Sequence, residues 1–151
     1  MKTLKQHIFE KLKVSVRNTT KHTLFPTTKD ELKRMIEDEI SKHGNECSLN
    51  HIDVSEITNM SSLFYYSKFN GNISEWDVSN VTDMAQMFYD SEFNGDISAW
   101  DVLSATDMFG MFANSKFNGD ISKWDVSNVK RMNTMFLNSP LENNPPAWYK
   151  E

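Results

Sequence analysis

The sequence predicts an α/β repeat solenoid of four 24-residue coils, each with a short parallel strand and a short helix. Three observations support this fold class. The stretches FNGNISEWDVSN (69–80), FNGDISAWDV (93–102) and FNGDISKWDVSN (117–128) are near-copies of one another. All four tryptophans fall in one column when the chain is written with a period of 24. Within each coil, the spacing of apolar residues changes from every second residue to every third or fourth.

The start of each coil predicts the strand. Tryptophan and valine alternate with aspartate, which places the two apolar side chains on one face of an extended segment and the carboxylate on the other. The tryptophan column consists of Trp76, Trp100, Trp124 and Trp148, and the aspartate column beside it consists of Asp53, Asp77, Asp101 and Asp125. Both columns are interpreted as structural ladders along the stack.

The second half of each coil predicts the helix. In VTDMAQMF, the apolar residues lie at i, i+3, i+6 and i+7, which is one face of a helix: Val81, Met84, Met87 and Phe88. Asn80 is spaced to cap the start of this helix. A strand and a helix of this length cannot bury their apolar faces alone, so we expect the stacked coils to share one continuous core.

The segments that flank the repeats predict caps. The chain divides into an N-terminal helical cap (1–51), the four-coil repeat solenoid (52–147) and a C-terminal cap or tail (148–151). The stretch TTKDELKRMIEDEISKHG predicts an amphipathic helix, with Thr28 and Glu31 as a capping box and Gly44 as its stop. Its apolar stripe, suited to cover the first coil, consists of Leu32, Met35, Ile36 and Ile40. Capped ends favour a monomer.

The motif FNGDISxWDVSNVTDM and the MF pair, within about residues 52–148, resemble the BspA-type repeats of bacterial surface proteins, a family similar to leucine-rich repeats. The lead-in FPTTKDELKRMIEDEISKHGNECSLNHIDVSEITNMSSLF resembles the segment that often precedes such repeats. The resemblance implies a right-handed solenoid, with short parallel strands on one side and short helices on the other. It implies little chemistry, because the family's activities are mostly adhesion or unassigned.

Composition and charge argue against several classes of protein. Residues 52–147 carry more Asp and Glu than Lys and Arg, whereas phosphate binding needs a basic surface, so nucleic acid is not an expected partner. The single cysteine allows no internal disulfide. The start, MKTLKQHIFEKLKVSV, has polar residues every few positions, which predicts neither a signal peptide nor a membrane span. We expect a cytoplasmic protein, with the cell surface as the alternative.

The aspartate column allows two interpretations. Side chains on neighbouring strands stand about 4.8 Å apart, and a row of carboxylates at that spacing could bind Ca²⁺. The favoured interpretation is structural, with each aspartate accepting hydrogen bonds from backbone N–H groups of the turn that follows it. A Ca²⁺ loop would instead concentrate several oxygen ligands within one segment. We therefore expect no metal and no cofactor.

His43, Cys47 and His51 are each four residues apart, a spacing that suggests a zinc site or a Cys–His catalytic pair. Gly44 and Asn45 interrupt the helix that would align them, and no fourth ligand is evident. No nucleophile elbow, phosphate loop or metalloprotease motif is present. We therefore expect no enzyme, with a thiol enzyme at Cys47 as the last alternative.

The basic residues within positions 1–29 could contact nucleic acid or an acidic lipid surface. They are Lys2, Lys5, Lys11, Lys13, Arg17, Lys21 and Lys29. A run of this kind is more often a solvated surface, which is the favoured interpretation.

The expected function is a non-catalytic protein–protein interaction module. In one version the chain is a small cytosolic inhibitor, of the phage or mobile-element type, that docks on another protein. This expectation depends on the small size, the caps and the missing secretion signal. The alternative is a surface adhesin exported by a route that the N-terminus does not reveal.

Comparison of the coils with one another places the predicted binding surface. Outward positions that vary between coils are free to contact a partner, whereas invariant ones are explained by the architecture. The residue before tryptophan varies freely, and the residue after valine changes once from serine to leucine. The predicted surface consists of His51, Glu75, Ala99, Leu103 and Lys123, and the alternative surface, on the predicted helix side, consists of Tyr65, Tyr66 and Tyr89.

Overall fold

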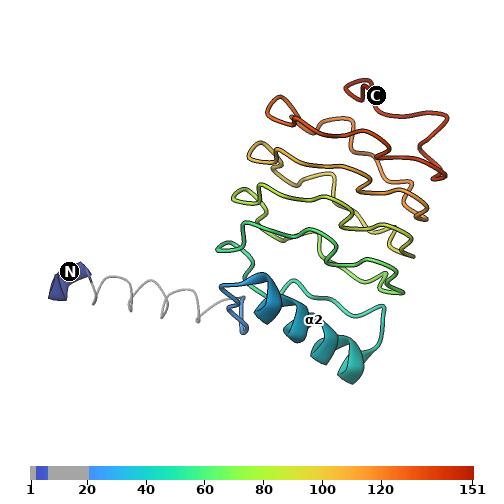
Figure 1. Cartoon of the computed structure of the whole chain (residues 1–151). Helices are drawn as coiled ribbons and strands as arrows, with labels where there is room; N and C mark the ends of the chain where they lie inside the picture. Colours follow the sequence, from blue (N-terminus) through green and yellow to red (C-terminus); the bar gives the residue numbers. More distant parts are fainter. Residues whose placement is uncertain (1–2, 7–20) are drawn as a thin grey trace.

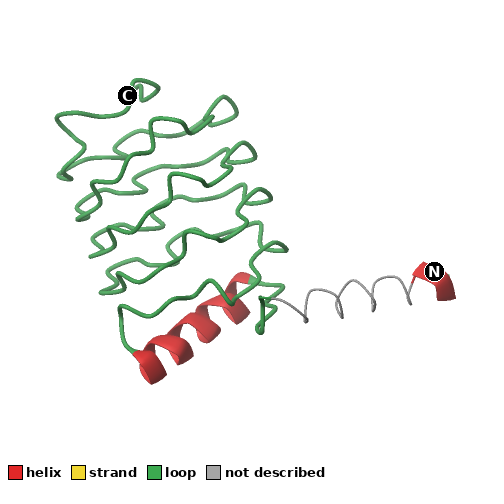
Figure 2. Ribbon diagram, turned by 180° about the vertical axis from the view of Figure 1, so that it is seen from behind, coloured by secondary structure: helices red, strands yellow, loops and turns green. Residues whose placement is uncertain are grey.

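The computed structural model describes residues 3–6 and 21–151 of the chain. Figure 1 shows helix α2 (Lys29–His43) at one end of a stack of coils and the C-terminus at the other end. The coils, numbered one to four in chain order, are residues 52–75, 76–99, 100–123 and 124–147. Figure 2, seen from behind, shows that they consist of loops and turns.

Helix α2 is delimited by its capping residues. The side chain of Thr28 accepts a hydrogen bond of 3.2 Å from the N–H of Glu31, one of the groups that the first turn of a helix leaves unpaired. In return, the Glu31 carboxylate accepts a bond of 2.8 Å from the N–H of Thr27, which lowers the pKa of Glu31. Gly44 ends the helix at φ 86°, a left-handed conformation that glycine adopts without steric cost.

Leu32 and Ile36 of α2 close the N-terminal end of the core. Both side chains are buried, and both belong to the apolar cluster that continues through the coils. Burial of such a side chain contributes about 1.5–3 kcal/mol. Lys29 Nζ also donates a hydrogen bond of 2.9 Å to Ser61 Oγ, which attaches the start of the helix to the first coil.

The predicted α/β solenoid, with parallel strands and a short helix in each coil, is wrong. Among residues 3–6 and 21–151, helix occurs at 4–6 and in α2 but not in the repeats. Over the same residues the chain forms isolated parallel bridges in place of a β-sheet: Leu24 with Ile52, Ser48 with Asn72, Asn59 with Asp83, Asp83 with Asp107, and Asp107 with Arg131. Each repeat is therefore a succession of turns.

The segment predicted as a helix forms consecutive turns because its backbone changes handedness. The N–H of Met87 bonds to the carbonyl of Met84 at 3.2 Å, and Gln86 between them has φ 54°. A positive φ at the third residue is typical of a type II turn and cannot be part of a right-handed helix. Consecutive turns space apolar residues nearly as a helix does, so the sequence pattern is compatible with both.

The segment predicted as a strand also turns. The N–H of Trp76 bonds back to the carbonyl of Ile73 at 3.2 Å, and the N–H of Val81 bonds back to Val78 at 2.9 Å. The backbone around Trp76 and Val78 therefore forms hydrogen bonds within its own turns, and no β-bridge forms at these residues. Alternation of apolar and polar side chains survives without strand pairing.

Backbone hydrogen bonds between coils run along one face, here called the turn face: residues 59–66, 83–90, 107–114 and 131–138. At each junction, four N–H groups at alternate residues of one coil donate to four carbonyls of the next coil. Between the first two coils the donors are Met60, Ser62, Phe64 and Tyr66, and the acceptors are Asp83, Ala85, Met87 and Tyr89. The pattern repeats at the next two junctions, so all these donors point towards the C-terminal end.

Aromatic ladders fill the core between the faces. The rings of Trp76, Trp100 and Trp124 stack with centroids 6.5 Å apart. A parallel phenylalanine ladder, with spacings of 5.4 to 5.9 Å, consists of Phe64, Phe88, Phe112 and Phe136. Such pairs contribute about 0.5–1.5 kcal/mol each beyond the burial of their area. The core is therefore continuous through all four coils.

Candidate protein-binding site

Three tyrosines form an exposed cluster on the turn face, where the first coil meets the second. Tyr65 stacks on Tyr89, with ring centroids 5.0 Å apart and planes 15° apart. Tyr66 packs edge-on against both, at 4.5 Å from Tyr65 and 5.9 Å from Tyr89. Tyr65 is 40% exposed and Tyr66 is 62% exposed, so the cluster faces solvent. The structure thus brings the three residues of the alternative surface together; below they are called the tyrosine cluster.

The backbone at Tyr66 is left-handed, with φ 54°. The equivalent residues of the other coils, Asp90, Asn114 and Asn138, have φ between 50° and 58°. Asp and Asn tolerate this conformation because their short polar side chains bond locally, whereas it costs other L-residues about 1–2 kcal/mol. Tyr66 therefore occupies a position that favours Asn or Asp, and its ring is not buried in compensation. Residues that break a local rule in this way concentrate at functional sites.

The helix predicted for this segment does not account for the left-handed backbone, although the sequence carries a signal for it. Asp90, Asn114 and Asn138 recur at one position of the repeat, and they are the residue types other than glycine that adopt a left-handed conformation routinely. A column of this composition indicates a turn and argues against a helix.

Within the tyrosine cluster, Tyr66 is uncharged at neutral pH. The hydrogen bond with the Tyr65 side chain is the main cause that raises the pKa of Tyr66 above the usual value of a tyrosine. An uncharged aromatic surface with hydroxyl groups can pack against apolar side chains and still offer hydrogen bonds. These are the properties of aromatic residues at protein interfaces.

The surface predicted from the variable columns is divided in the structure. Ala99 and Lys123 are exposed and line a shallow hollow of about 330 Å³ with Ser98 and Asp120. Leu103 is 43% exposed but does not line this hollow. The structure thus brings Ala99 and Lys123 together and leaves Leu103 outside the hollow, as an exposed apolar side chain.

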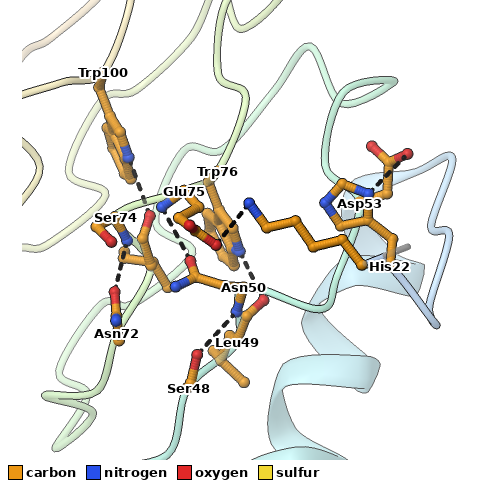
Figure 3. A network of polar contacts seen from close by, with 12 residues as sticks. His22, Ser48, Leu49, Asn50, Asp53, Asn72, Ser74, Glu75, Trp76 and Trp100 are labelled. Carbon is orange, nitrogen blue, oxygen red and sulfur yellow. Dashed lines mark hydrogen bonds and ion pairs between the residues drawn. The ribbon is translucent and has the colours of Figure 1, made fainter. Parts of the chain in front are cut away.

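The other two residues of that surface contact the N-terminal region. His51 Nε2 lies 2.9 Å from Glu39 Oε2, and Glu75 Oε2 lies 2.6 Å from Lys21 Nζ. The side chain of Asn50 also accepts a hydrogen bond of 3.0 Å from the N–H of Glu75 (Figure 3). His51 and Glu75 are therefore already engaged within the chain.

The aspartate column makes hydrogen bonds within turns. Oδ1 of Asp77, Asp101 and Asp125 accepts the backbone N–H two residues later, at 3.0 Å in each case. Asp53 does the same for Ser55, and it also lies 3.9 Å from His22 (Figure 3). Across residues 3–6 and 21–151, no group of three or more His, Cys, Asp or Glu side chains is placed to hold a metal ion.

Cys47 and the two histidines predicted beside it lie near Glu39. His43 Nε2 is 3.9 Å from Glu39 Oε2, the same oxygen that His51 contacts. Burial, followed by the negative charge of Glu39, raises the pKa of the Cys47 thiol. A nucleophilic cysteine needs a lowered pKa, so this environment does not favour thiol chemistry.

The basic residues of positions 1–29 are only partly described. Lys2, Lys11, Lys13 and Arg17 lie outside the described residues. Lys5 is exposed, and Lys21 and Lys29 contact Glu75 and Ser61. Within the described part of the chain, no helix combines the length and apolar character that crossing a membrane requires.

Comparison with known proteins identifies a family. Residues 30–148 match the family described as "Mycoplasma protein of unknown function, DUF285". No curated protein and no solved structure matches the chain. The matched residues include most of α2 and all four coils, which supports the expected repeat-type family.

Proposed function

Because the chain belongs to the DUF285 family of Mycoplasma proteins, whose function is unknown, we propose a function from its surface: it is a non-catalytic protein-interaction module. It binds a partner protein through the tyrosine cluster. In the proposed complex, the ring of Tyr66 enters a pocket of the partner, and Tyr65 and Tyr89 hold that ring in place.

Tyr66 is the observation that supports the proposal. Its ring is 62% exposed, and two neighbouring rings already restrict its motion. Binding would therefore cost little additional side-chain entropy. Tyrosine is also enriched among the residues that dominate interface energies. Because the backbone at this position favours Asn or Asp, a contact made by the exposed ring explains why tyrosine is present.

A second surface for the same function lies around Leu103 and Lys123. Leu103 is apolar and exposed where the other coils have serine, and Lys123 lines the neighbouring hollow. We rank it below the tyrosine cluster because Leu103 is a single apolar side chain, whereas the three tyrosines are in mutual contact.

We further propose that the repeats are of the BspA type, on the strength of their FNGDIS motifs, and that the protein docks on its partner in the cytoplasm as a small inhibitor. A surface adhesin is the alternative setting. Fractionation of the native host separates the two: an inhibitor is recovered with the cytoplasmic proteins, whereas an adhesin is cleaved by protease added to intact cells.

The binding test compares variants in affinity capture from a lysate of the native host, followed by titration of the captured partner. We expect Tyr66→Asn to weaken the affinity for that partner by at least about tenfold, a loss typical of a hot-spot residue. The same change should leave the melting temperature unchanged or raise it, because Asn tolerates the left-handed conformation. Tyr66→Phe should retain most of the affinity.

Asn114→Asp is the matched control, since it alters the same column two coils away and keeps a residue type that tolerates the backbone. It should change neither binding nor stability. The proposal is wrong if the partner binds Tyr66→Asn as tightly as the wild type. A loss of binding with Leu103→Asp, together with a retained fold, would then assign the contact to the second surface.

A further inference from the structure

We propose that the C-terminal end of the stack binds an acidic, turn-forming segment of a partner protein, which packs on the fourth coil as each coil packs on the one before it. This second surface does not depend on the tyrosine cluster. It is called the C-terminal edge, and it consists of the side chains of Val126, Val129, Met132 and Trp148 and the backbone N–H groups of Met132, Thr134, Phe136 and Asn138.

The C-terminal edge presents four backbone donors in a row. At the three junctions between coils, the equivalent N–H groups all donate to carbonyls of the next coil. The N–H of Phe112, for example, donates to the carbonyl of Met135 at 2.9 Å. On the fourth coil, these groups have no acceptor within the described residues: Met132, Thr134, Phe136 and Asn138. Phe136 is only 1% exposed, so water has little access to its N–H. An unpaired buried donor is costly, and an incoming carbonyl would remove that cost.

The same edge leaves apolar side chains partly uncovered. Val126, Val129 and Met132 are half-buried. Their equivalents in the third coil are buried because the fourth coil covers them: Val102, Ala105 and Met108. The repeat architecture itself therefore indicates what this surface accommodates, namely a segment of consecutive turns with apolar residues at i, i+3 and i+6.

The charged side chains at the C-terminal edge indicate the charge of the segment that binds there. The three apolar side chains and Trp148 line a hollow of roughly 490 Å³. Its charged lining residues are three basic ones, Lys130, Arg131 and Lys150, and one acidic one, Glu151. Arg131 already pairs with Asp107 at 2.8 Å, but neither lysine forms an ion pair within the described residues. A basic border on a protein of net charge −5 favours an acidic partner segment.

A second copy of this chain fits the C-terminal edge poorly. The segments with suitable spacing, such as Val78, Val81 and Met84, are buried within the stack. At the opposite end of the stack, Leu32 and Ile36 of α2 occupy the apolar face of the first coil. Head-to-tail stacking of copies would therefore require α2 to be displaced.

The test uses a synthetic peptide with the sequence of residues 75–88, EWDVSNVTDMAQMF, which is acidic and has the required apolar spacing. Amide hydrogen exchange of the full chain is measured with and without it. We expect the peptide to slow exchange at Met132 and Thr134 by at least about tenfold, as new hydrogen bonds form. The equivalent amides of Met84 and Gln86, already bonded, should not change.

Charge reversal supplies the second measurement. Lys130→Glu combined with Lys150→Glu should weaken the affinity for the labelled peptide by at least about fivefold. Fluorescence anisotropy at low salt measures this binding. The matched control introduces Lys68→Glu and Lys116→Glu, which change the net charge equally at exposed residues outside the hollow. These control changes should have little effect on the affinity.

Several results would overturn the proposal. One is unchanged exchange at Met132 and Thr134 at saturating peptide. Another is equal binding of a scrambled peptide, which would show that charge and not the spacing of apolar residues determines binding. The third is concentration-dependent dimerisation in light scattering that protects Met132 without peptide, which would assign the edge to a second copy of the chain.

Discussion

The indole N–H of Trp100, the first residue of the third coil, donates a hydrogen bond of 3.1 Å to the carbonyl of Ile73, near the end of the first coil. The same bond, always 27 residues apart, joins Trp76 to Leu49, Trp124 to Ile97 and Trp148 to Ile121. In a stack without a β-sheet, the carbonyls of these residues rely on donors outside a sheet ladder, such as side-chain N–H groups. The tryptophan column supplies them while its rings stack in the core.

Truncation of this column should be costly in the middle of the stack. Trp100→Ala should lower the free energy of unfolding by about 3–5 kcal/mol, because it removes a buried ring and one of the two hydrogen bonds that the Ile73 carbonyl accepts. Trp148→Ala should cost less, because Trp148 is half-buried and stacks on one tryptophan, whereas Trp100 is buried and stacks on two. Equal losses in chemical denaturation would contradict this order of contacts.

Gly71 should tolerate no side chain, for a reason that its equivalents do not share. A Cβ at Gly71 would lie 1.8 Å from the carbonyl oxygen of Cys47, a backbone atom that cannot move aside locally. At Gly119, the three atoms nearest to an added Cβ all belong to the ring of Phe117, at 2.7 Å and beyond. We expect Gly71→Ala to destabilise the protein by more than about 2 kcal/mol in urea denaturation, and Gly119→Ala to cost clearly less. Similar values for both would exclude the close approach at Cys47.

Helix α2 should be required to cover the first coil. Leu32→Ala should lower the free energy of unfolding by about 2–5 kcal/mol, while Lys33→Ala, on the exposed face, should change it by less than about 0.5 kcal/mol. Deletion of residues 1–50 should expose the buried edge at Ile52 and Ile57 and cause aggregation in light scattering. A soluble, cooperatively melting monomer from that deletion would show that the cap is dispensable.

Acid should destabilise the protein through Asp96, Asp120 and Asp125. In each case the serine hydroxyl two residues later, followed by its backbone N–H, lowers the pKa of the carboxyl group. A folded pKa below the unfolded value of about 3.9 stabilises the protein above that value, and this stability is lost as the pH falls through the folded pKa. Melting temperatures should therefore fall as the pH is lowered below about 4.

The matched variant for this pH effect replaces the three serines with alanine: Ser98→Ala, Ser122→Ala and Ser127→Ala. It should melt at a lower temperature than the wild type at pH 7, because the hydroxyl hydrogen bonds are lost. Its further loss between pH 7 and pH 3 should be smaller. Parallel pH profiles for the two proteins would exclude these aspartates as the source of acid sensitivity.

The sequence by itself determined the repeat and much of the packing. The period of 24 places Trp100 above Trp76, and it also places Phe88 above Phe64, as the stacked rings require. It also grouped Tyr65, Tyr66 and Tyr89 as one possible surface, because their side chains recur at neighbouring positions of adjacent coils. Side-chain identity is sufficient for such inferences, since apolar residues must be buried whatever the backbone does.

Only the tertiary structure decided the course of the backbone and the character of the surfaces. The spacing of Met84, Met87 and Phe88 suits a helix and a pair of turns equally. Turns result because the N–H groups of this face bond to carbonyls about 24 residues away, and Gln86 and Asp90 become left-handed to direct them there. Those acceptors exist only once the next coil is in place, so no local pattern reveals them. For the same reason, only the folded stack shows that the N–H groups of Met132, Thr134, Phe136 and Asn138 lack an acceptor within the described residues.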